Sequence, residues 1–277
     1  MTVPPQSGLT WDWLSFESPK QLLASSWPQA RLLSDRWRTA TGRGVRVCLL
    51  DSGVALDHPA VGTLDGSYVV VPTELGGFEV VAETAGDSYG HGTACASIIR
   101  RKAPECSLSS LRVLGVGLGS GAALVHGLGW AVDQGFDVIS MSLSTRHARF
   151  EGQLRELADL AYFHGTTIVA AAHNARVESY PWRLSSVVSV GSHAVPDDDI
   201  VFYNAQPPVE FLARGRNVRG ASLDGRERGW SGNSFATPLI AGRCAQIKSA
   251  FPELTPIQIK CALILGADNV VPGGPDD

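Results

Sequence analysis

Three short segments of the sequence contain residue types that could carry out nucleophilic catalysis. An apolar run ends in LLDSG, which contains Asp51; GHGT places His91 between two glycines; GNSFATP contains Ser234 just before a predicted helix. Taken singly, such residues are most often a strand-end cap, a tight turn and a helix N-cap. Together they follow the order Asp, His, Ser along the chain, one of the orders in which a single acid–base–nucleophile geometry is assembled.

The three side chains have complementary roles in hydrolysis. Ser234 is a poor nucleophile until a base removes its proton. His91 can accept that proton near neutral pH and return it to the leaving group. Asp51 would hold the imidazole in one tautomer and stabilise the imidazolium that forms.

A regular alternation of apolar runs and amphipathic stretches would position these residues. Strands are expected over 45–51, 108–114, 137–143, 166–172 and 187–191, and helices over 94–100, 121–134, 151–164, 238–251 and 255–265. This alternation predicts an α/β fold with a parallel sheet covered on both faces. In such sheets, functional residues gather at the carboxyl ends of the strands.

Composition excludes several classes of protein. The chain has 277 residues, a net charge of −4 and only 18% charged residues, which argues against a nucleic-acid partner. No apolar run is long enough to predict a membrane span. The first residues do not resemble a secretion signal, so a cytoplasmic location is expected. Five cysteines without CxxC spacing predict buried free thiols rather than a metal site.

The motifs resemble those of the subtilase family of serine peptidases. The resemblance is carried by VRVCLLDSGVALDHPAV, GDSYGHGTACASII and GNSFATPLIAG, and extends from about residue 27 to about residue 267. It implies a subtilisin-like three-layer sandwich, with a mostly parallel central sheet and helices on both faces. It also implies a serine endopeptidase that hydrolyses peptide bonds through an acyl-enzyme intermediate. Residues 27–277 would form the peptidase domain, and residues 1–26 an N-terminal extension.

The resemblance also implies residues that bind the substrate. TTIVAAAHNA resembles the strand that leads to the family's oxyanion-hole asparagine, here Asn174, which would act with the backbone N–H of Ser234. An extended peptide would lie along two edge segments. The residues expected there are Leu114, Gly115, Gly117, Ser142, Leu143, Ser144 and His173.

Four departures from the family pattern modify these expectations. Ala60 stands where the family has a calcium-binding aspartate, and the loop with further ligands is missing, so no metal and no cofactor are expected. His173 and Ser144 replace glycines of the substrate cleft, which predicts a narrow substrate range. The N-terminal extension leaves no room for a long folding propeptide and is either inhibitory or a structural arm. Arginines upstream of Ser234 favour acidic substrates or, as the preferred interpretation, form a solvated loop face; they are Arg214, Arg216, Arg219, Arg226 and Arg228.

Rival functions remain open at this point. GLGSGA, from Gly117, fits a dinucleotide-binding pattern with Asp137 twenty residues later, but Asp137 begins its strand, whereas that acid should end one. A pseudopeptidase that binds peptides without cutting them is the second rival. Within the peptidase interpretation, the role is either general degradation or dedicated processing, such as the trimming of leader peptides. The sequence does not indicate the oligomeric state.

Overall fold

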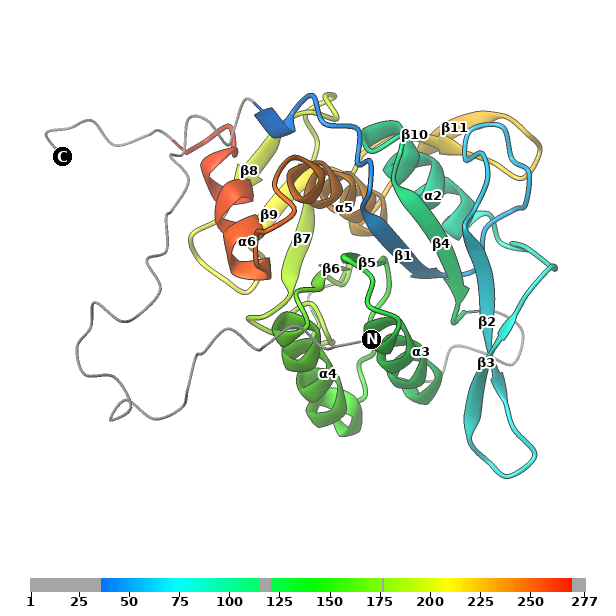
Figure 1. Ribbon diagram of the computed structural model, residues 1–277. Coiled ribbons are helices and arrows are strands. Elements are labelled where there is room, and N and C mark those ends of the chain that lie inside the picture. Colours follow the sequence, from blue (N-terminus) through cyan, green and yellow to red (C-terminus); the bar gives the residue numbers. More distant parts are fainter. Residues whose placement is uncertain (1–35, 115–120, 176, 271–277) are drawn as a thin grey trace, which may run out of the picture.

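The computed structural model describes residues 36–114, 121–175 and 177–270, and its centre is a nine-stranded sheet (Figure 1). The strand order is β3-β2-β4-β1-β5-β6-β7-β9-β8. The strands are β1 (Arg46–Asp51), β2 (Gly66–Pro72), β3 (Phe78–Ala82), β4 (Ser107–Arg112), β5 (Val138–Met141), β6 (Thr167–Ala171), β7 (Val188–His193), β8 (Val201–Tyr203) and β9 (Phe211–Arg214). The neighbouring strands pair in parallel except at the two edges, where β3 and β8 are antiparallel. The expected mostly parallel sheet is therefore confirmed.

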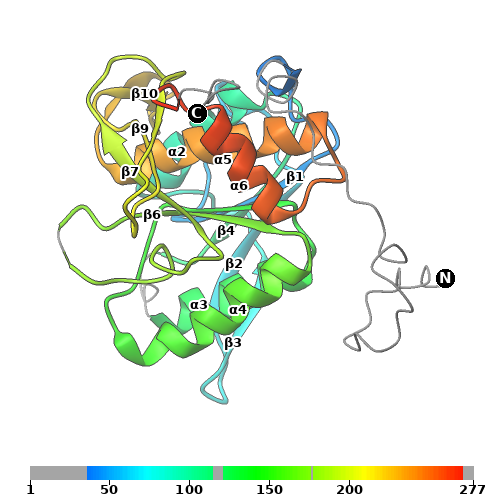
Figure 2. The ribbon, with the colours of Figure 1, turned by 90° about the vertical axis from the view of Figure 1, so that its left-hand side faces the viewer.

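Helices cover both faces of this sheet and complete a three-layer sandwich (Figure 2). The helices are α2 (His91–Lys102), α3 (Gly121–Asp133), α4 (Glu151–Phe163), α5 (Asn233–Ala250) and α6 (Pro256–Leu265), with a short 3-10 turn at Ala148–Phe150. α2 and α5 pack against each other on one face, and α3 and α4 lie together on the other. A separate hairpin of β10 (Val218–Ala221) and β11 (Glu227–Trp230) packs beside α2. Within the described residues, no helix is long and apolar enough to cross a membrane.

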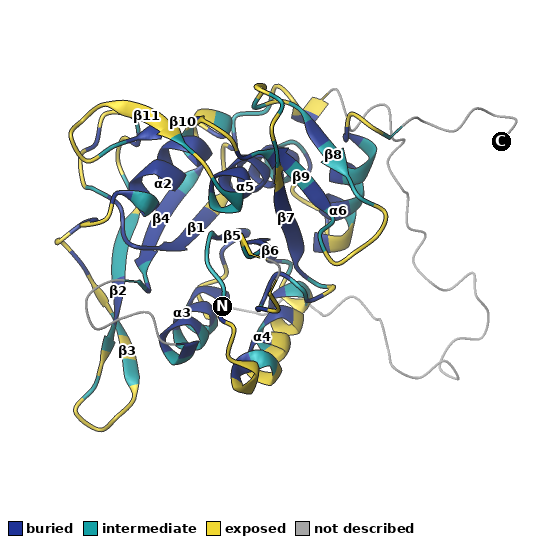
Figure 3. Ribbon diagram, turned by 180° about the vertical axis from the view of Figure 1, so that it is seen from behind, coloured by how far each residue is buried: buried dark blue, intermediate teal, exposed yellow. Residues whose placement is uncertain are grey.

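The alternation of side chains along β1 explains why both faces are covered. Val47 and Leu49 point into the core under α2 and α5, whereas Cys48 and Leu50 point into the core under α3 and α4. All four side chains are fully buried, as are most residues of the central strands (Figure 3). A strand buried on both faces is apolar at consecutive positions rather than at alternate ones, which is why the LL of LLDSG predicts a central parallel strand.

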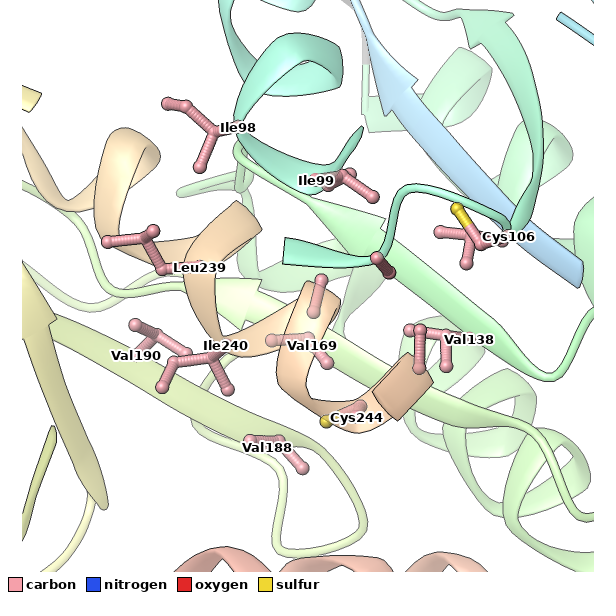
Figure 4. Close-up of a cluster of buried hydrophobic side chains, with 14 of the residues drawn as sticks. Ile98, Ile99, Cys106, Val138, Val169, Val188, Val190, Leu239, Ile240 and Cys244 are labelled. Carbon is pink, nitrogen blue, oxygen red and sulfur yellow. The ribbon is translucent and has the colours of Figure 1, made fainter. Parts of the chain in front are cut away.

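The larger core lies between α2, α5 and the sheet. Ile98 and Ile99 of α2 and Leu239 and Ile240 of α5 belong to it, and Figure 4 shows Ile240 beside Val169 and Val190 of the central strands. Burying an apolar side chain of this size contributes about 1.5–3 kcal/mol. This core therefore holds α2 against β1 and against α5, and holds α5 against β5, β6 and β7.

Several elements differ from the expectations. The strands β2, β3, β8, β9, β10 and β11 were not predicted. α2 begins at His91 rather than at residue 94, and α5 begins at Asn233 rather than at residue 238. Pro238 therefore lies inside α5, and Ser234 lies in its first turn.

Candidate active site

Asp51 and His91 are brought together by the end of β1 and the start of α2. Asp51 is the last residue of β1 and is only 1% exposed. His91 is the first residue of α2, and its Nδ1 lies 2.7 Å from Asp51 Oδ1. The backbone N–H of Ser52 donates to the same carboxylate oxygen at 2.8 Å. The carboxylate thus accepts two hydrogen bonds that fix its orientation toward the imidazole.

Two glycines permit this close approach of strand and helix. Gly53 has a φ of +94°, a conformation that L side chains rarely adopt. A Cβ on Gly92 would lie 2.0 Å from the carbonyl oxygen of Gly53. The glycines of DSG and GHG are therefore required by backbone contact.

A buried polar network holds the first turn of α2. Ser52 Oγ accepts the N–H of Gly92 at 3.0 Å and donates to Asp87 Oδ1 at 3.0 Å. The other oxygen of Asp87 accepts both the N–H and the hydroxyl of Thr93, at 3.0 and 2.7 Å. Because Asp87 receives backbone donors at a helix N-terminus, its charge is favourably placed. Sequence reasoning missed Asp87 and Ser52 as residues that position His91; the only signal was an acid four residues before it.

Ser234 lies at the start of α5, opposite His91. It follows Gly232, whose φ is 139°. Phe235 packs against the His91 ring with centroids 4.9 Å apart, and Cys95 Sγ lies 3.9 Å from His91 Nδ1 and 3.5 Å from the carbonyl oxygen of Ser234. Within the described residues, Ser234 Oγ and His91 form no hydrogen bond, so the triad is closed at its Asp–His contact and open at its His–Ser contact. Such catalytic bonds often tighten only when the substrate binds.

Asn174 lies beside Ser234. A Cβ on Gly232 would lie 3.5 Å from Ser234 Oγ and 3.5 Å from both the oxygen and the nitrogen of the Asn174 amide. The backbone N–H of Asn233 donates to Asn174 Oδ1 at 2.9 Å. Because a backbone N–H requires an acceptor, this bond fixes the amide orientation and leaves Asn174 Nδ2 available to donate to an oxyanion.

The electrostatic environment favours the charged form of His91. Burial lowers the pKa of His91, but the Asp51 carboxylate and, to a smaller extent, Cys95 raise it more, so that the pKa lies well above its ordinary value. Burial raises the pKa of the Cys95 thiol. The site therefore stabilises an imidazolium, which is the state that His91 would reach after accepting the proton of Ser234.

Comparison with known proteins shows to which family the chain belongs. The subtilase family model matches residues 42–277. The chain is a member of the subtilase family. It is 29% identical over 250 residues to subtilisin DY of Bacillus licheniformis, covering 83% of this chain and 85% of that protein.

Solved structures agree with the subtilase fold. A cold-adapted subtilisin-like serine proteinase superposes with a TM-score of 0.66 and 26% identity, over 82% of this chain and 83% of that one. A lanthipeptide protease superposes with a TM-score of 0.63 and 23% identity, over 79% of this chain and 78% of that one. The subtilisin-like three-layer fold and serine endopeptidase activity are thus the properties that this subtilase shares with its relatives.

The expected substrate-binding residues of this subtilase fall into three groups. Leu114, Leu143, Ser144 and His173 line one cavity of about 210 Å³. Ser142 instead donates from Oγ to the Ser234 carbonyl oxygen at 2.7 Å. Gly115 and Gly117 lie outside the described residues.

Four of the five arginines upstream of Ser234 are exposed, whereas Arg214 is partly buried. Arg214 pairs with Asp198 at 3.1 Å, Arg219 pairs with Glu227 at 2.9 Å, and Arg228 stacks over Trp230. The rival dinucleotide pattern gains no support from the structure, because Asp137 precedes β5 and accepts the N–H of Arg46 at the amino ends of the strands.

The residues present do not fit a calcium ion at the position that the resemblance to other subtilases implies. Ala60 offers no carboxylate there. The Arg100 guanidinium instead donates to four main-chain carbonyls of the two neighbouring loops, those of Val61, Thr63, Pro104 and Cys106, at 2.7–3.1 Å. An arginine thus donates hydrogen bonds to carbonyl oxygens, which are ligands of the kind that calcium binds. Elsewhere among the described residues, Asp51, His91 and Cys95 form the single group of three potential ligands, and it is part of the candidate catalytic site.

Proposed function

We propose that Asp51, His91 and Ser234 are the residues with which this serine endopeptidase cleaves peptide bonds. The observation that carries the proposal is the 2.7 Å contact between Asp51 and His91 on α2, which packs directly against the helix that bears Ser234. Asn174 Nδ2 and the backbone N–H of Ser234 would form the oxyanion hole.

The proposed steps follow from this arrangement. Ser234 Oγ attacks the carbonyl carbon of the substrate while its proton passes to His91 Nε2, and the carbonyl oxygen becomes an anion that accepts the two donors. The C–N bond then breaks as His91 returns the proton to the leaving amine, which leaves an acyl-enzyme on Ser234. Water, deprotonated by His91, hydrolyses this ester and regenerates the hydroxyl of Ser234.

Intact-mass measurement after exposure to a fluorophosphonate probe tests this assignment. The wild-type chain is expected to gain one adduct, and Ser234→Ala is expected to gain none. A chain with Asp51→Asn should react far more slowly, because His91 then lacks the partner that orients it. An adduct that also forms on Ser234→Ala would contradict the proposal. The absence of an adduct on either chain would favour the pseudopeptidase, unless removal of residues 1–26 restores labelling and so identifies an inhibitory extension.

We further propose that the enzyme is a dedicated processing peptidase rather than a general degradative one. The small cavity of about 210 Å³ beside His173 supports this role, since it restricts the side chains that can bind there. A second cavity of about 630 Å³, against Asn174 and Asn233, is larger, so the restriction applies to the first cavity alone. The fold shared with a lanthipeptide protease is compatible with it. The five free cysteines, four of them buried, suit a reducing compartment, which supports a cytoplasmic location. Rapid digestion of unfolded casein to small peptides would argue against a dedicated role.

A further inference from the structure

The cavity beside the candidate active site has an apolar floor and a basic rim. The apolar surface comes from Leu114, Leu124 and Leu143. The side chains that can donate hydrogen bonds are those of Arg146, His147 and His173. Its volume of about 210 Å³ is below the usual range for a small-molecule site and suits a single side chain.

The position of the cavity ties it to the bond that would be cut. His173 directly precedes Asn174, the proposed oxyanion donor. Leu143 directly follows Ser142, which contacts the Ser234 carbonyl. Because these two neighbours belong to the candidate active site, the side chain in the cavity would belong to a residue near the scissile bond.

The cavity is lined by basic side chains, and none of the residues that line it is acidic. Glu151 and Glu178, on the flanking segments, are engaged by Arg155 and Arg183. Arg146 is exposed and has no ion-pair partner among the described residues. Its guanidinium is therefore available to a ligand.

The tautomer of His173 adds a second donor. His173 Nδ1 lies 3.0 Å from the backbone N of Ala175 and 3.3 Å from the carbonyl oxygen of Ala175. Because the N–H can only donate and its contact is the shorter one, Nδ1 acts as the acceptor. The ring proton of neutral His173 then resides on Nε2, which can donate a hydrogen bond into the cavity. His173, which stands where the family has glycine, thus supplies a hydrogen-bond donor in addition to reducing the space in the cleft.

We propose that this cavity is a subsite for an acidic side chain of the peptide substrate, with a carboxylate bound by Arg146 and by Nε2–H of His173. The methylenes of a glutamate would pack on the leucine floor while its carboxylate reaches the rim, and an arginine fork suits a carboxylate geometrically. The inference rests on the proposed function, because it names the substrate class of that same site.

Direct binding to Ser234→Ala tests the subsite without requiring turnover. The probes are fluorescein-labelled, positionally scanned octapeptide pools that carry one fixed Glu or one fixed Gln at each position in turn. Fluorescence anisotropy is expected to show binding at least about 5-fold tighter for Glu than for Gln at one position, corresponding to about 1 kcal/mol for a partly exposed charge pair. This ratio should fall as salt screens the pair.

Second substitutions in the Ser234→Ala background identify the residues responsible. Arg146→Gln should bring the Glu/Gln ratio close to one, and His173→Gly should reduce it. Arg149→Gln is the matched control: Arg149 is also exposed and lies three residues away, but it stacks over Phe150 and does not line the cavity. It should leave the ratio unchanged.

The outcomes separate this inference from the proposed function. A ratio of one at every position in folded Ser234→Ala overturns the subsite, even where the wild-type chain is labelled by the fluorophosphonate. A preference for Glu that persists in Arg146→Gln and in His173→Gly also overturns it. A preference that depends on Arg146, in a chain that is not labelled even after removal of residues 1–26, supports the subsite and contradicts the proposed catalysis.

Discussion

The hydroxyl of Ser142 donates a hydrogen bond of 2.7 Å to the main-chain carbonyl oxygen of Ser234. In an α-helix this oxygen would accept the N–H of the residue four positions later, but that residue is Pro238, which has no N–H. The proline therefore leaves the carbonyl free, and Ser142, just after β5, supplies the missing donor. Cys95 Sγ lies at 3.5 Å from the same oxygen as a weaker second donor. Two residues outside α5 thus supply the hydrogen-bond donors that the first turn of this helix lacks.

Replacement of this donor should slow catalysis. Ser142→Ala is expected to lower kcat/KM about 10-fold, since the net value of such a hydrogen bond is about 1–1.5 kcal/mol and its loss lets Ser234 shift. The rate of fluorophosphonate labelling measures the effect at Ser234 directly. Ser140→Ala is the matched control, because Ser140 Oγ is buried in the same strand without a hydrogen-bond partner. An equal loss in both variants would indicate a general packing effect.

Removal of the Asn174 amide, the side chain proposed as an oxyanion donor, should affect turnover more than binding. Asn174→Ala is expected to lower kcat by about 10²–10³-fold with little change in KM, because the donor acts on charge that develops only in the transition state. Steady-state kinetics on one peptide substrate separate the two constants. A change confined to KM would instead assign Asn174 to ground-state binding of the peptide.

The electrostatics of His91 predict an activity profile shifted to alkaline pH. His91 must be neutral to accept the proton of Ser234, and its pKa is raised because Asp51 and Cys95 outweigh the effect of burial. The value of kcat/KM should therefore rise with pH through an inflection above the ordinary histidine value of about 6.5. Asp51→Asn should move this inflection to lower pH while reducing kcat by about 10⁴-fold. An inflection below pH 6 in the wild type would contradict the assigned environment.

The central strands and the contact between Asp51 and His91 could be predicted from the sequence because the segments that carry them are local patterns. LLDSG shows both a doubly buried strand and its polar end, and the structure places Asp51 where that pattern indicates. The start of α5 could not be predicted, because Pro238 lies inside the helix and the Ser234 carbonyl that it leaves free is satisfied by tertiary contacts with Ser142 and Cys95. The edge strand β3 was missed because its residues are mostly exposed and show no strict alternation. The role of Asp87 depends on Ser52, 35 residues earlier, and no local pattern reports that contact.

The contacts of Arg100 predict stability that does not depend on calcium. Its guanidinium links the loop after β1, at Val61 and Thr63, to the loop after α2, at Pro104 and Cys106. Arg100→Leu removes this charged link and leaves four carbonyls without their donor. It is expected to lower the free energy of unfolding by about 2–4 kcal/mol, since hydrogen bonds to charged groups contribute about 1.5–3 kcal/mol each and the site is partly exposed.

A neighbouring arginine provides the control for this prediction. Arg101 follows Arg100 in α2 but pairs at the surface with Asp198 at 3.0 Å, so Arg101→Leu should cost at most about 1 kcal/mol. Thermal unfolding of the wild type should give the same Tm in EDTA and in millimolar calcium. A Tm of the wild type that rises by several degrees with calcium would contradict this prediction, because it would show that calcium stabilises the protein in the presence of Arg100. An Arg100→Leu variant that gains stability from calcium, in a wild type that does not, would instead confirm that the guanidinium fills a cation's place among these carbonyls.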